Sequence, residues 1–254
     1  MPGNEWDPHD YDEGHGFVTD CGRELLELLH LGPDERVLDV GCGTGHLTAA
    51  IADSGAGVLG IDAAEAMVAQ ARERYPNLAF EVADAREYRP DRQFDTVFSN
   101  AALHWIPGPD HDAVLATVAD ALGDAGRFVA EFGGRGNVSQ VVGALQAELR
   151  KRGDDADHSW YFPSVGEYAP RLESHGLEVT SAWLFDRPTE LEGGADGLRE
   201  WAGMFGDEMF TAVDDGEREA ILDAVEDRLR PSLFDVETET WTVDYRRLRV
   251  VAER

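Results

Sequence analysis

The sequence predicts an α/β fold built on a doubly wound, mostly parallel sheet. From Arg36 onward, short apolar runs alternate with helical stretches, which is the pattern of βαβ units. A glycine-rich turn follows the first of these runs and precedes the first helix. The chain has 254 residues, enough to bury a full core as one large domain or as one domain with a modest insertion.

The first half of the chain supplies five expected strands and the helices between them. The expected strands are residues 36–40, 57–61, 78–82, 95–99 and 127–132. The helices expected between them are residues 46–53, 64–75 and 112–122. A further helix is expected ahead of the first strand, around residues 20–29, with Leu25, Leu26, Leu28 and Leu29 on its apolar side.

The second half changes character. A helix is expected at residues 164–175 and a strand at 178–185, followed by helices at 197–205 and 217–229. Residues 238–251 alternate apolar and polar side chains, which predicts a strand long enough to be part of a hairpin at the sheet edge. A helical insertion therefore separates the last two strands, where such folds keep their substrate cover.

Charge is the strongest compositional feature. The chain carries 51 acidic and 22 basic side chains, a formal net charge of -29, and Lys151 is its single lysine. At this charge density self-repulsion opposes the compact state in dilute buffer, whereas molar salt screens it within about 3 Å. The composition therefore favours a protein of a salt-accumulating halophile, an archaeon in particular. The same field repels a phosphate backbone, so no nucleic-acid partner is expected.

Other compositional features favour a cytoplasmic protein. No stretch approaches the roughly 20 apolar residues of a membrane span, so no membrane partner is expected. The first residues carry neither a basic segment nor an apolar one, as a secretory signal would. Cys21 and Cys42 are isolated and lack metal-like spacing, and no metal is expected.

The glycine-rich turn, Gly41-Cys42-Gly43-Thr44-Gly45, predicts a nucleoside site. Glycine lets the backbone turn sharply and approach a ligand closely, and the helix that follows offers free N–H groups. Asp62, at the end of the next strand, is placed to accept the hydroxyls of a ribose. A dinucleotide-binding pattern would need a third glycine at the position of His46, which disfavours a nucleotide-dependent oxidoreductase.

The segment from Val37 to Gly45 resembles the first motif of class I S-adenosylmethionine-dependent methyltransferases, including its acidic residue, Asp39, before the glycines. The resemblance continues with Asp62, with Asp84 and Ala85 after the third strand, and with Phe94-Asp95 opening the fourth. These motifs are specific as a set and cover about residues 36–132. The resemblance implies a seven-stranded Rossmann-like sheet and S-adenosylmethionine as the methyl donor, with S-adenosylhomocysteine as its product.

The resemblance also implies which parts of the chain bind the cofactor and which part covers the substrate. A single domain, residues 1–254, would contain an N-terminal cover (1–30), a cofactor-binding core (31–152) and a C-terminal half (153–254) with a helical substrate cap at about 190–234. The glycine turn would approach the methionine part of the cofactor, Asp62 the ribose, and Asp84 with Ala85 the adenine. The implied cofactor residues are Tyr11, His15, Asp39, Gly41, Cys42, Gly43, Gly45, Asp62, Ala63, Met67, Asp84, Ala85 and Asn100.

The segment after the fourth strand, Asn100-Ala101-Ala102-Leu103-His104-Trp105, resembles the trans-aconitate methyltransferases. Its Leu-His-Trp is also similar to the juvenile hormone acid methyltransferases. Both groups esterify small carboxylic acids, so the resemblance implies O-methylation of a small-molecule carboxylate. His104 has two functional interpretations, a general base for a hydroxyl or amine substrate and a donor that holds a carboxylate. Trp105 is a candidate neighbour of the sulfonium.

Several further residues are candidates for contact with the methyl acceptor. Arg135 is placed to pair with a carboxylate in a bidentate fashion. The apolar cover is expected to include Trp160, Trp201 and Phe205, with Tyr161, Phe162 and Met204 beside them. Two alternatives stay open: a methyltransferase for a quinone-like or other hydroxyl substrate, and a non-catalytic S-adenosylmethionine-binding protein. Either a monomer or a homodimer is compatible with the sequence.

Overall fold

The computed structural model describes residues 24–32, 34–153 and 157–254. These residues form two compact units. The first unit comprises the described chain up to Arg135 together with residues 160–185 and 247–254, and the second comprises residues 136–159 and 186–246. The chain therefore leaves the first unit after its fifth strand and returns to complete the sheet.

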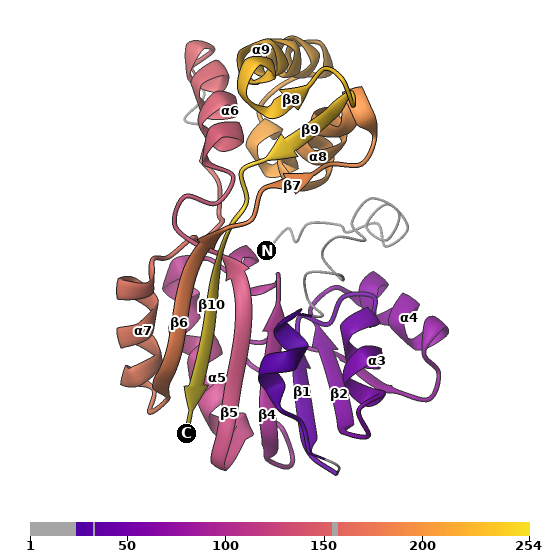
Figure 1. The fold of residues 1–254 in the computed structure, drawn as a ribbon, viewed down its shortest axis with the longest axis vertical. Helices are drawn as coiled ribbons and strands as arrows, with labels where there is room; N and C mark the ends of the chain where they lie inside the picture. The colour runs from indigo at the N-terminus through magenta and orange to yellow at the C-terminus, as the bar shows by residue number, and fades with distance from the viewer. Residues whose placement is uncertain (1–23, 33, 154–156) are drawn as a thin grey trace. The chain divides into compact units, whose positions relative to one another are not determined.

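The first unit is built on a seven-stranded sheet in the order β3-β2-β1-β4-β5-β10-β6 (Figure 1). The strands are β1 (Arg36–Val40), β2 (Gly57–Asp62), β3 (Ala79–Val82), β4 (Phe94–Asn100), β5 (Leu122–Gly133), β6 (Glu178–Asp186) and β10 (Arg246–Glu253). Pairing is parallel from β3 through β5, and β10 runs antiparallel to β5. The predicted doubly wound, mostly parallel sheet is confirmed.

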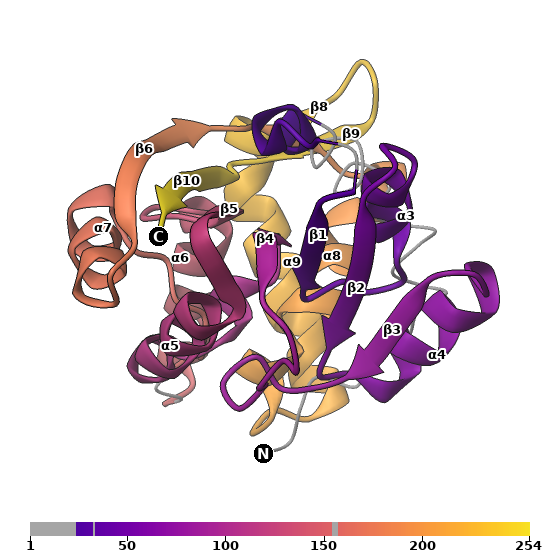
Figure 2. The ribbon, with the colours of Figure 1, turned by 90° about the horizontal axis from the view of Figure 1, so that it is seen from below.

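Helices cover both faces of this sheet, because strand side chains alternate between two apolar clusters. Leu38 and Val97 lie in the cluster that contains side chains of α5, whereas their neighbours Val37 and Phe98 lie in the cluster that contains Ile51 of α3. Figure 2 shows α5 and α7 together on one face. The helical elements of this unit are η1 (Glu27–Leu29), α3 (His46–Ala52), α4 (Glu65–Arg74), η2 (Leu103–Trp105), η3 (Gly108–Asp110), α5 (His111–Ala121) and α7 (Val165–Ser174).

The second unit is mainly helical and has a small antiparallel sheet of its own. Its helices are α6 (Ser139–Lys151), η4 (Gly194–Asp196), α8 (Gly197–Phe205), η5 (Asp207–Phe210) and α9 (Asp215–Leu233). Its sheet has the order β7-β9-β8, made of β7 (Thr189–Glu190), β8 (Phe234–Asp235) and β9 (Thr240–Val243). Helix α6, which packs against α9, was not predicted from the sequence. The expected substrate cap, residues 190–234, falls inside this unit. The residues of α6 also belong to this unit, although the sequence analysis placed them at the end of the cofactor-binding core, residues 31–152.

The expected strand at residues 238–251 is wrong in two respects. It is two strands, because the Tyr245 N–H donates to the Val243 carbonyl at 2.9 Å and the chain turns out of the ladder there. Residues before the turn form β9, which pairs with β7 in the small sheet. Residues after it form β10, which pairs with β5 inside the large sheet and leaves β6 at the edge. The apolar positions change phase at the turn, from Trp241, Val243 and Tyr245 before it to Leu248 and Val250 after it, and the expectation of one continuous strand overlooked this change.

Candidate active site

The candidate site lies at the carboxyl ends of β1, β2 and β4. The chain winds outward from β1 through β2 to β3, then crosses to β4 and continues to β5. Ligands of open α/β sheets bind where the strand order reverses in this way, outside the carboxyl ends of the strands. The glycine turn follows β1, Asp62 ends β2 and the half-buried Asn100 ends β4, so the structure brings these three predicted elements to one edge of the sheet.

The glycine turn is shaped by two different requirements. At Gly41, φ is +75° and an added Cβ would lie 2.2 Å from the Ala102 Cβ, so close packing excludes a side chain. At Gly43, φ is +53° and an added Cβ would meet nothing within 4 Å. Gly43 is half-buried, and its lack of a side chain leaves the backbone open to the approach of a nucleoside-containing ligand. Gly45, the third glycine, directly precedes α3.

Asp62 is held by the backbone around it. Its two carboxylate oxygens accept the Gly43 N–H and the Ala64 N–H, each at 2.9 Å. Burial raises the pKa of Asp62, and these hydrogen bonds to the carboxylate oppose that effect. The Ala63 N–H is a third backbone donor to this carboxylate, and the acceptor capacity that remains suits a ribose hydroxyl as the hydrogen-bond donor. Of the other residues expected beside it, Ala63 is exposed and Met67 is buried in α4.

Asp39 lies in β1, two residues before the glycine turn. It is only 2% exposed, and the Thr48 hydroxyl donates to its Oδ2 at 2.6 Å. Burial raises the pKa of Asp39 to about 7, the Thr48 hydrogen bond opposes this, and the nearby Asp62 adds to it. Cys42 packs against Gly60, and burial raises the pKa of its thiol, so Cys42 is a space-filling side chain and not a nucleophile.

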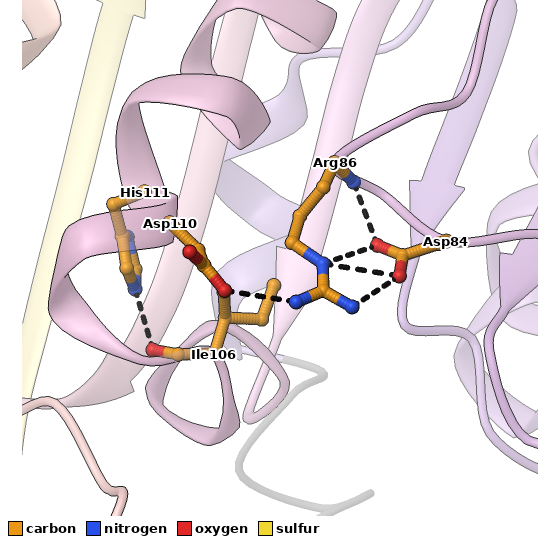
Figure 3. A network of polar contacts seen from close by, with 5 residues as sticks. All are labelled: Asp84, Arg86, Ile106, Asp110 and His111. Atoms are coloured by element: carbon orange, nitrogen blue, oxygen red, sulfur yellow. Dashed lines mark hydrogen bonds and ion pairs between the residues drawn. The ribbon is translucent and has the colours of Figure 1, made fainter. Parts of the chain in front are cut away.

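Asp84, expected at the adenine, is engaged by Arg86 (Figure 3). Its Oδ1 accepts the Arg86 backbone N–H at 2.9 Å, and both carboxylate oxygens accept the guanidinium. These hydrogen bonds hold the pKa of Asp84 below its ordinary value. Arg86 also donates to Asp110 at 2.8 Å. Ala85 lies between the two paired residues and is half-buried.

His104 is buried in the 3₁₀ turn η2, just after β4. The turn begins beyond Ala101, whose φ of +53° is uncommon for a residue with a side chain. The Gly133 N–H of β5 donates to His104 Nδ1 at 3.3 Å. Burial, followed by the charges of Arg247 and His111, lowers the pKa of His104 well below its ordinary value. The ring is therefore neutral at pH 7, and because Nδ1 accepts, its proton is on Nε2.

Aromatic side chains surround His104. Its ring lies 5.1 Å from that of Trp105 and 5.9 Å from that of Phe162. Trp160 completes the group, with its ring 5.9 Å from Trp105 in an edge-to-face arrangement. Segments that are distant in sequence thus form one aromatic cluster, defined here as His104, Trp105, Trp160 and Phe162.

Arg247 is the site residue that the sequence analysis missed. It is 6% exposed in β10, directly opposite Gly133, the residue that donates to His104. A sequence signal existed, because Arg247 stands in a strand whose neighbours alternate apolar side chains. A buried cation beside His104 makes this end of the sheet attractive to an anion.

The remaining predicted residues are not members of this cluster. Arg135 is 62% exposed and pairs with Glu167 at 2.5 Å. Trp201 and Phe205 are buried in the second unit, where the Trp201 indole N–H donates to the Tyr245 hydroxyl at 2.7 Å. Tyr11 and His15 lie outside the described residues.

Comparisons with known proteins agree with this architecture. Residues 37–126 match the family model described as a methyltransferase domain. The chain is 33% identical over 268 aligned positions to an uncharacterized methyltransferase of Schizosaccharomyces pombe, with 100% of both chains covered. It is 39% identical over 207 positions to a trans-aconitate 2-methyltransferase of Deinococcus radiodurans, covering 77% of this chain and 78% of the relative.

A solved structure gives the same result for the fold. The YcgJ protein of Bacillus subtilis superposes with a TM-score of 0.63 at 17% identity, covering 94% of this chain and 99% of that one. The sheet order, the glycine turn with its acid at the end of β2, and full-length similarity to a methyltransferase lead to one conclusion. The chain belongs to the class I S-adenosylmethionine-dependent methyltransferases.

Proposed function

We propose that this methyltransferase esterifies the carboxylate of a small organic acid, and that His104 binds the acceptor as a hydrogen-bond donor. The observation that carries the proposal is the hydrogen bond from the Gly133 N–H to His104 Nδ1. It leaves the neutral ring with an N–H at Nε2, which donates to an acceptor oxygen. A general base would need an unprotonated Nε2. In that tautomer the ring proton would be on Nδ1, where it would face the Gly133 N–H.

The charge near His104 supports a carboxylate over a hydroxyl acceptor. Arg247, buried in the adjacent strand, favours an anion, and the charge of Arg247 also helps to keep His104 neutral. A carboxylate is already ionised near pH 7, so it needs no base, whereas a hydroxyl or quinol would. The similarity to a trans-aconitate 2-methyltransferase, an enzyme named for a carboxylic acid substrate, points the same way.

The proposed methyl transfer depends more on alignment of the acceptor with the methyl group than on proton transfer. S-adenosylmethionine supplies a methyl group that its sulfonium has already activated. His104 and Arg247 would fix the acceptor carboxylate, and in-line alignment can supply about 7–11 kcal/mol of barrier reduction. The aromatic cluster provides apolar surface that excludes water from the nucleophile, and the Trp105 ring favours a neighbouring cation by roughly 0.5–2 kcal/mol.

A substrate panel with two substitutions at His104 tests the proposal. We expect small di- and tricarboxylic acids to yield methyl esters, identified by mass and by alkaline hydrolysis. His104→Gln keeps an N–H donor and should retain most of the turnover, whereas His104→Ala should lose about 10- to 100-fold, the value of a hydrogen bond to a charged group. His175→Ala, which removes a ring that contacts Asp112 at 3.3 Å, is the matched control.

The pH profile separates the two roles of His104. With a carboxylic acid substrate, kcat should stay level between pH 6 and 9, because no group needs to lose a proton. A preference for phenols or quinols, with kcat rising with pH and with His104→Gln as inactive as His104→Ala, would overturn the proposal.

We assign the cofactor to the turn after β1 and the ends of β2, β3 and β4. Asp62 would accept the ribose hydroxyls and the open face at Gly43 would lie against the methionine part, while Asn100 ends the neighbouring strand. Residues 190–234 stay a prediction as the part of the chain that determines the substrate.

We also infer that the protein works in a salt-rich cytoplasm, on a small molecule and without a nucleic-acid partner, as a monomer or homodimer. The net charge of -29 supports this. Arginines are shared among several carboxylates, as at Arg199, which contacts Glu219, Asp223 and Glu226. No helix in the described ranges is long and apolar enough to cross a membrane. Within the same ranges, no group of three or more His, Cys, Asp or Glu side chains could hold a metal ion.

A further inference from the structure

The 3₁₀ turn η2, which carries His104, is held through its backbone carbonyls. The Tyr161 N–H donates to the His104 carbonyl at 3.0 Å. His111 Nε2 lies 3.1 Å from the Ile106 carbonyl, the contact drawn in Figure 3, and the Leu103 carbonyl is a second acceptor for the same ring. Because a carbonyl oxygen only accepts, the ring proton of His111 is on Nε2. One imidazole therefore binds the first residue of the turn and the residue that follows it.

The other ring nitrogen of His111 is also engaged. His111 is the first residue of α5 and is fully buried. Its Nδ1 lies 3.3 Å from the Tyr168 hydroxyl of α7, and with the ring proton on Nε2 this hydroxyl donates to Nδ1. Burial lowers the pKa of His111 to about 4 and raises the pKa of the Tyr168 hydroxyl. Both groups are therefore neutral at pH 7, and the hydrogen bonds keep these directions.

Aromatic packing holds the His111 ring in its plane. The ring centroid lies 4.6 Å from that of Tyr161 and 5.6 Å from that of Tyr168, the second pair in an edge-to-face arrangement. Tyr161 stands between Trp160 and Phe162, two members of the aromatic cluster around His104. The imidazole that binds η2 thus packs directly against the segment that lines the other side of His104.

We propose that His111 is a positioning residue for the methyl acceptor, which fixes η2 so that His104 presents its Nε2–H to the acceptor. His111 does not itself touch the acceptor, because it is fully buried and both of its nitrogens are bound within the fold. This inference rests on the proposed function, which assigns His104 to the acceptor.

A histidine that only stabilises the core predicts a different outcome. Loss of core packing lowers the fraction of folded chain, so kcat and the number of S-adenosylhomocysteine sites per chain fall together while the acceptor KM is unchanged. Loss of positioning leaves the number of cofactor sites unchanged and raises the acceptor KM. The acceptor KM and the stoichiometry of cofactor binding therefore separate the two roles.

Two substitutions of similar shape divide the hydrogen bonds of His111. The amide of glutamine reaches the position of Nε2, so His111→Gln keeps a donor for the carbonyls of η2. The amide of asparagine reaches only the position of Nδ1, so His111→Asn keeps a partner for the Tyr168 hydroxyl and loses that donor. We expect the acceptor KM to rise about 3- to 10-fold in His111→Asn, the value of a neutral hydrogen bond, and to stay within about twofold in His111→Gln. Both variants should bind S-adenosylhomocysteine with wild-type stoichiometry in calorimetry at fixed potassium chloride.

Val118→Ala is the matched control for loss of core packing. Val118 is buried in the apolar cluster on the same helix, α5. This variant should lower the melting temperature and leave the acceptor KM within about twofold. An increase in KM equal to that of His111→Asn would show that any loss of packing on α5 has the same effect, and would overturn the proposal.

A double-mutant cycle tests whether His111 acts through His104. In a His104→Ala background, His111→Asn should raise the acceptor KM no further. Additive increases, or a wild-type KM in His111→Asn alone, would overturn the proposal. If His111→Asn does not fold, Tyr168→Phe takes its place, because it keeps the aromatic ring and removes the hydroxyl that orients His111. It should raise the KM in the same direction, and an unchanged KM would again overturn the proposal.

The same measurements keep this inference distinct from the proposed function. The KM comparison uses whichever member of the substrate panel is methylated best, with trans-aconitate as the first acid tried. Methylation of phenols or quinols in place of acids would contradict the proposed function, whereas the ratio of KM values between His111→Asn and His111→Gln would still decide the role of His111.

Discussion

Asp39→Asn should reduce the dependence of folding stability on pH. In the folded chain, burial raises the pKa of Asp39 from 3.8 to about 7. Below about pH 4 the carboxyl group is protonated in both states. As pH rises from about 4 to 7 it ionises only in the unfolded chain, so the free energy of unfolding falls, and above pH 7 the loss is constant. Because each tenfold change in proton affinity corresponds to about 1.4 kcal/mol, the whole loss is on the order of 4 kcal/mol.

Urea unfolding between pH 4.5 and 8, at one potassium chloride concentration, measures this effect. The wild type should lose more stability over that interval than Asp39→Asn, which cannot ionise. Thr48→Val removes the hydroxyl that donates to Asp39 Oδ2 and opposes the raised pKa. The loss of stability in Thr48→Val should therefore extend to higher pH than in the wild type. Parallel pH profiles for the wild type and Asp39→Asn would show that the carboxyl group is ionised throughout and would refute the reasoning.

Three further predictions concern the cofactor site and the surface. Asp62→Ala should weaken S-adenosylmethionine binding at least about tenfold while the fold persists, because a charged hydrogen-bond acceptor is lost; unchanged affinity in calorimetry would remove the ribose assignment. Gly41→Ala should destabilise the fold by about 1–3 kcal/mol, because its Cβ would lie 2.2 Å from that of Ala102. Gly43→Ala shares the strain of a positive φ but meets no such neighbour, so it should destabilise the fold less than Gly41→Ala while it weakens cofactor binding, and equal unfolding curves for the two variants would contradict this. With a net charge of -29, the melting temperature should rise steeply between about 0.1 M and 2 M potassium chloride, and equal stability and activity in dilute buffer would refute the salt-adaptation argument.

Most of the large sheet could be predicted from the sequence, because strand and helix periodicities are local properties. The expected strand at 57–61 differs from β2, Gly57–Asp62, by one residue, and the expected helix at 197–205 coincides with α8. The assignment of the two halves of the terminal segment to different sheets could not be predicted in this way. Both halves of the terminal segment alternate apolar and polar residues, and only the available pairing partners decide which half joins which sheet.

Part of the candidate site could likewise be predicted from the sequence, and part of it could not. Glycine sterics and a strand-terminal acid identify the turn at Gly41 and the carboxylate at Asp62 from the sequence alone. The aromatic cluster brings Trp160 beside Trp105, and no spacing in the sequence indicates that pairing. Arg247 reaches the site only because β10 returns to the large sheet opposite Gly133.

The sequence by itself determined that this chain folds as a doubly wound sheet, that its glycine turn and strand-terminal acids suit a nucleoside-containing cofactor, and that its surface is strongly acidic. Those properties depend on residue type and local order. The tertiary structure decided that Asp84 is bound to Arg86 and that His104 presents Nε2–H, because Gly133 donates to its Nδ1. Which atom carries a proton, and which charge is already paired, depends on neighbours that only the folded chain brings within hydrogen-bond distance.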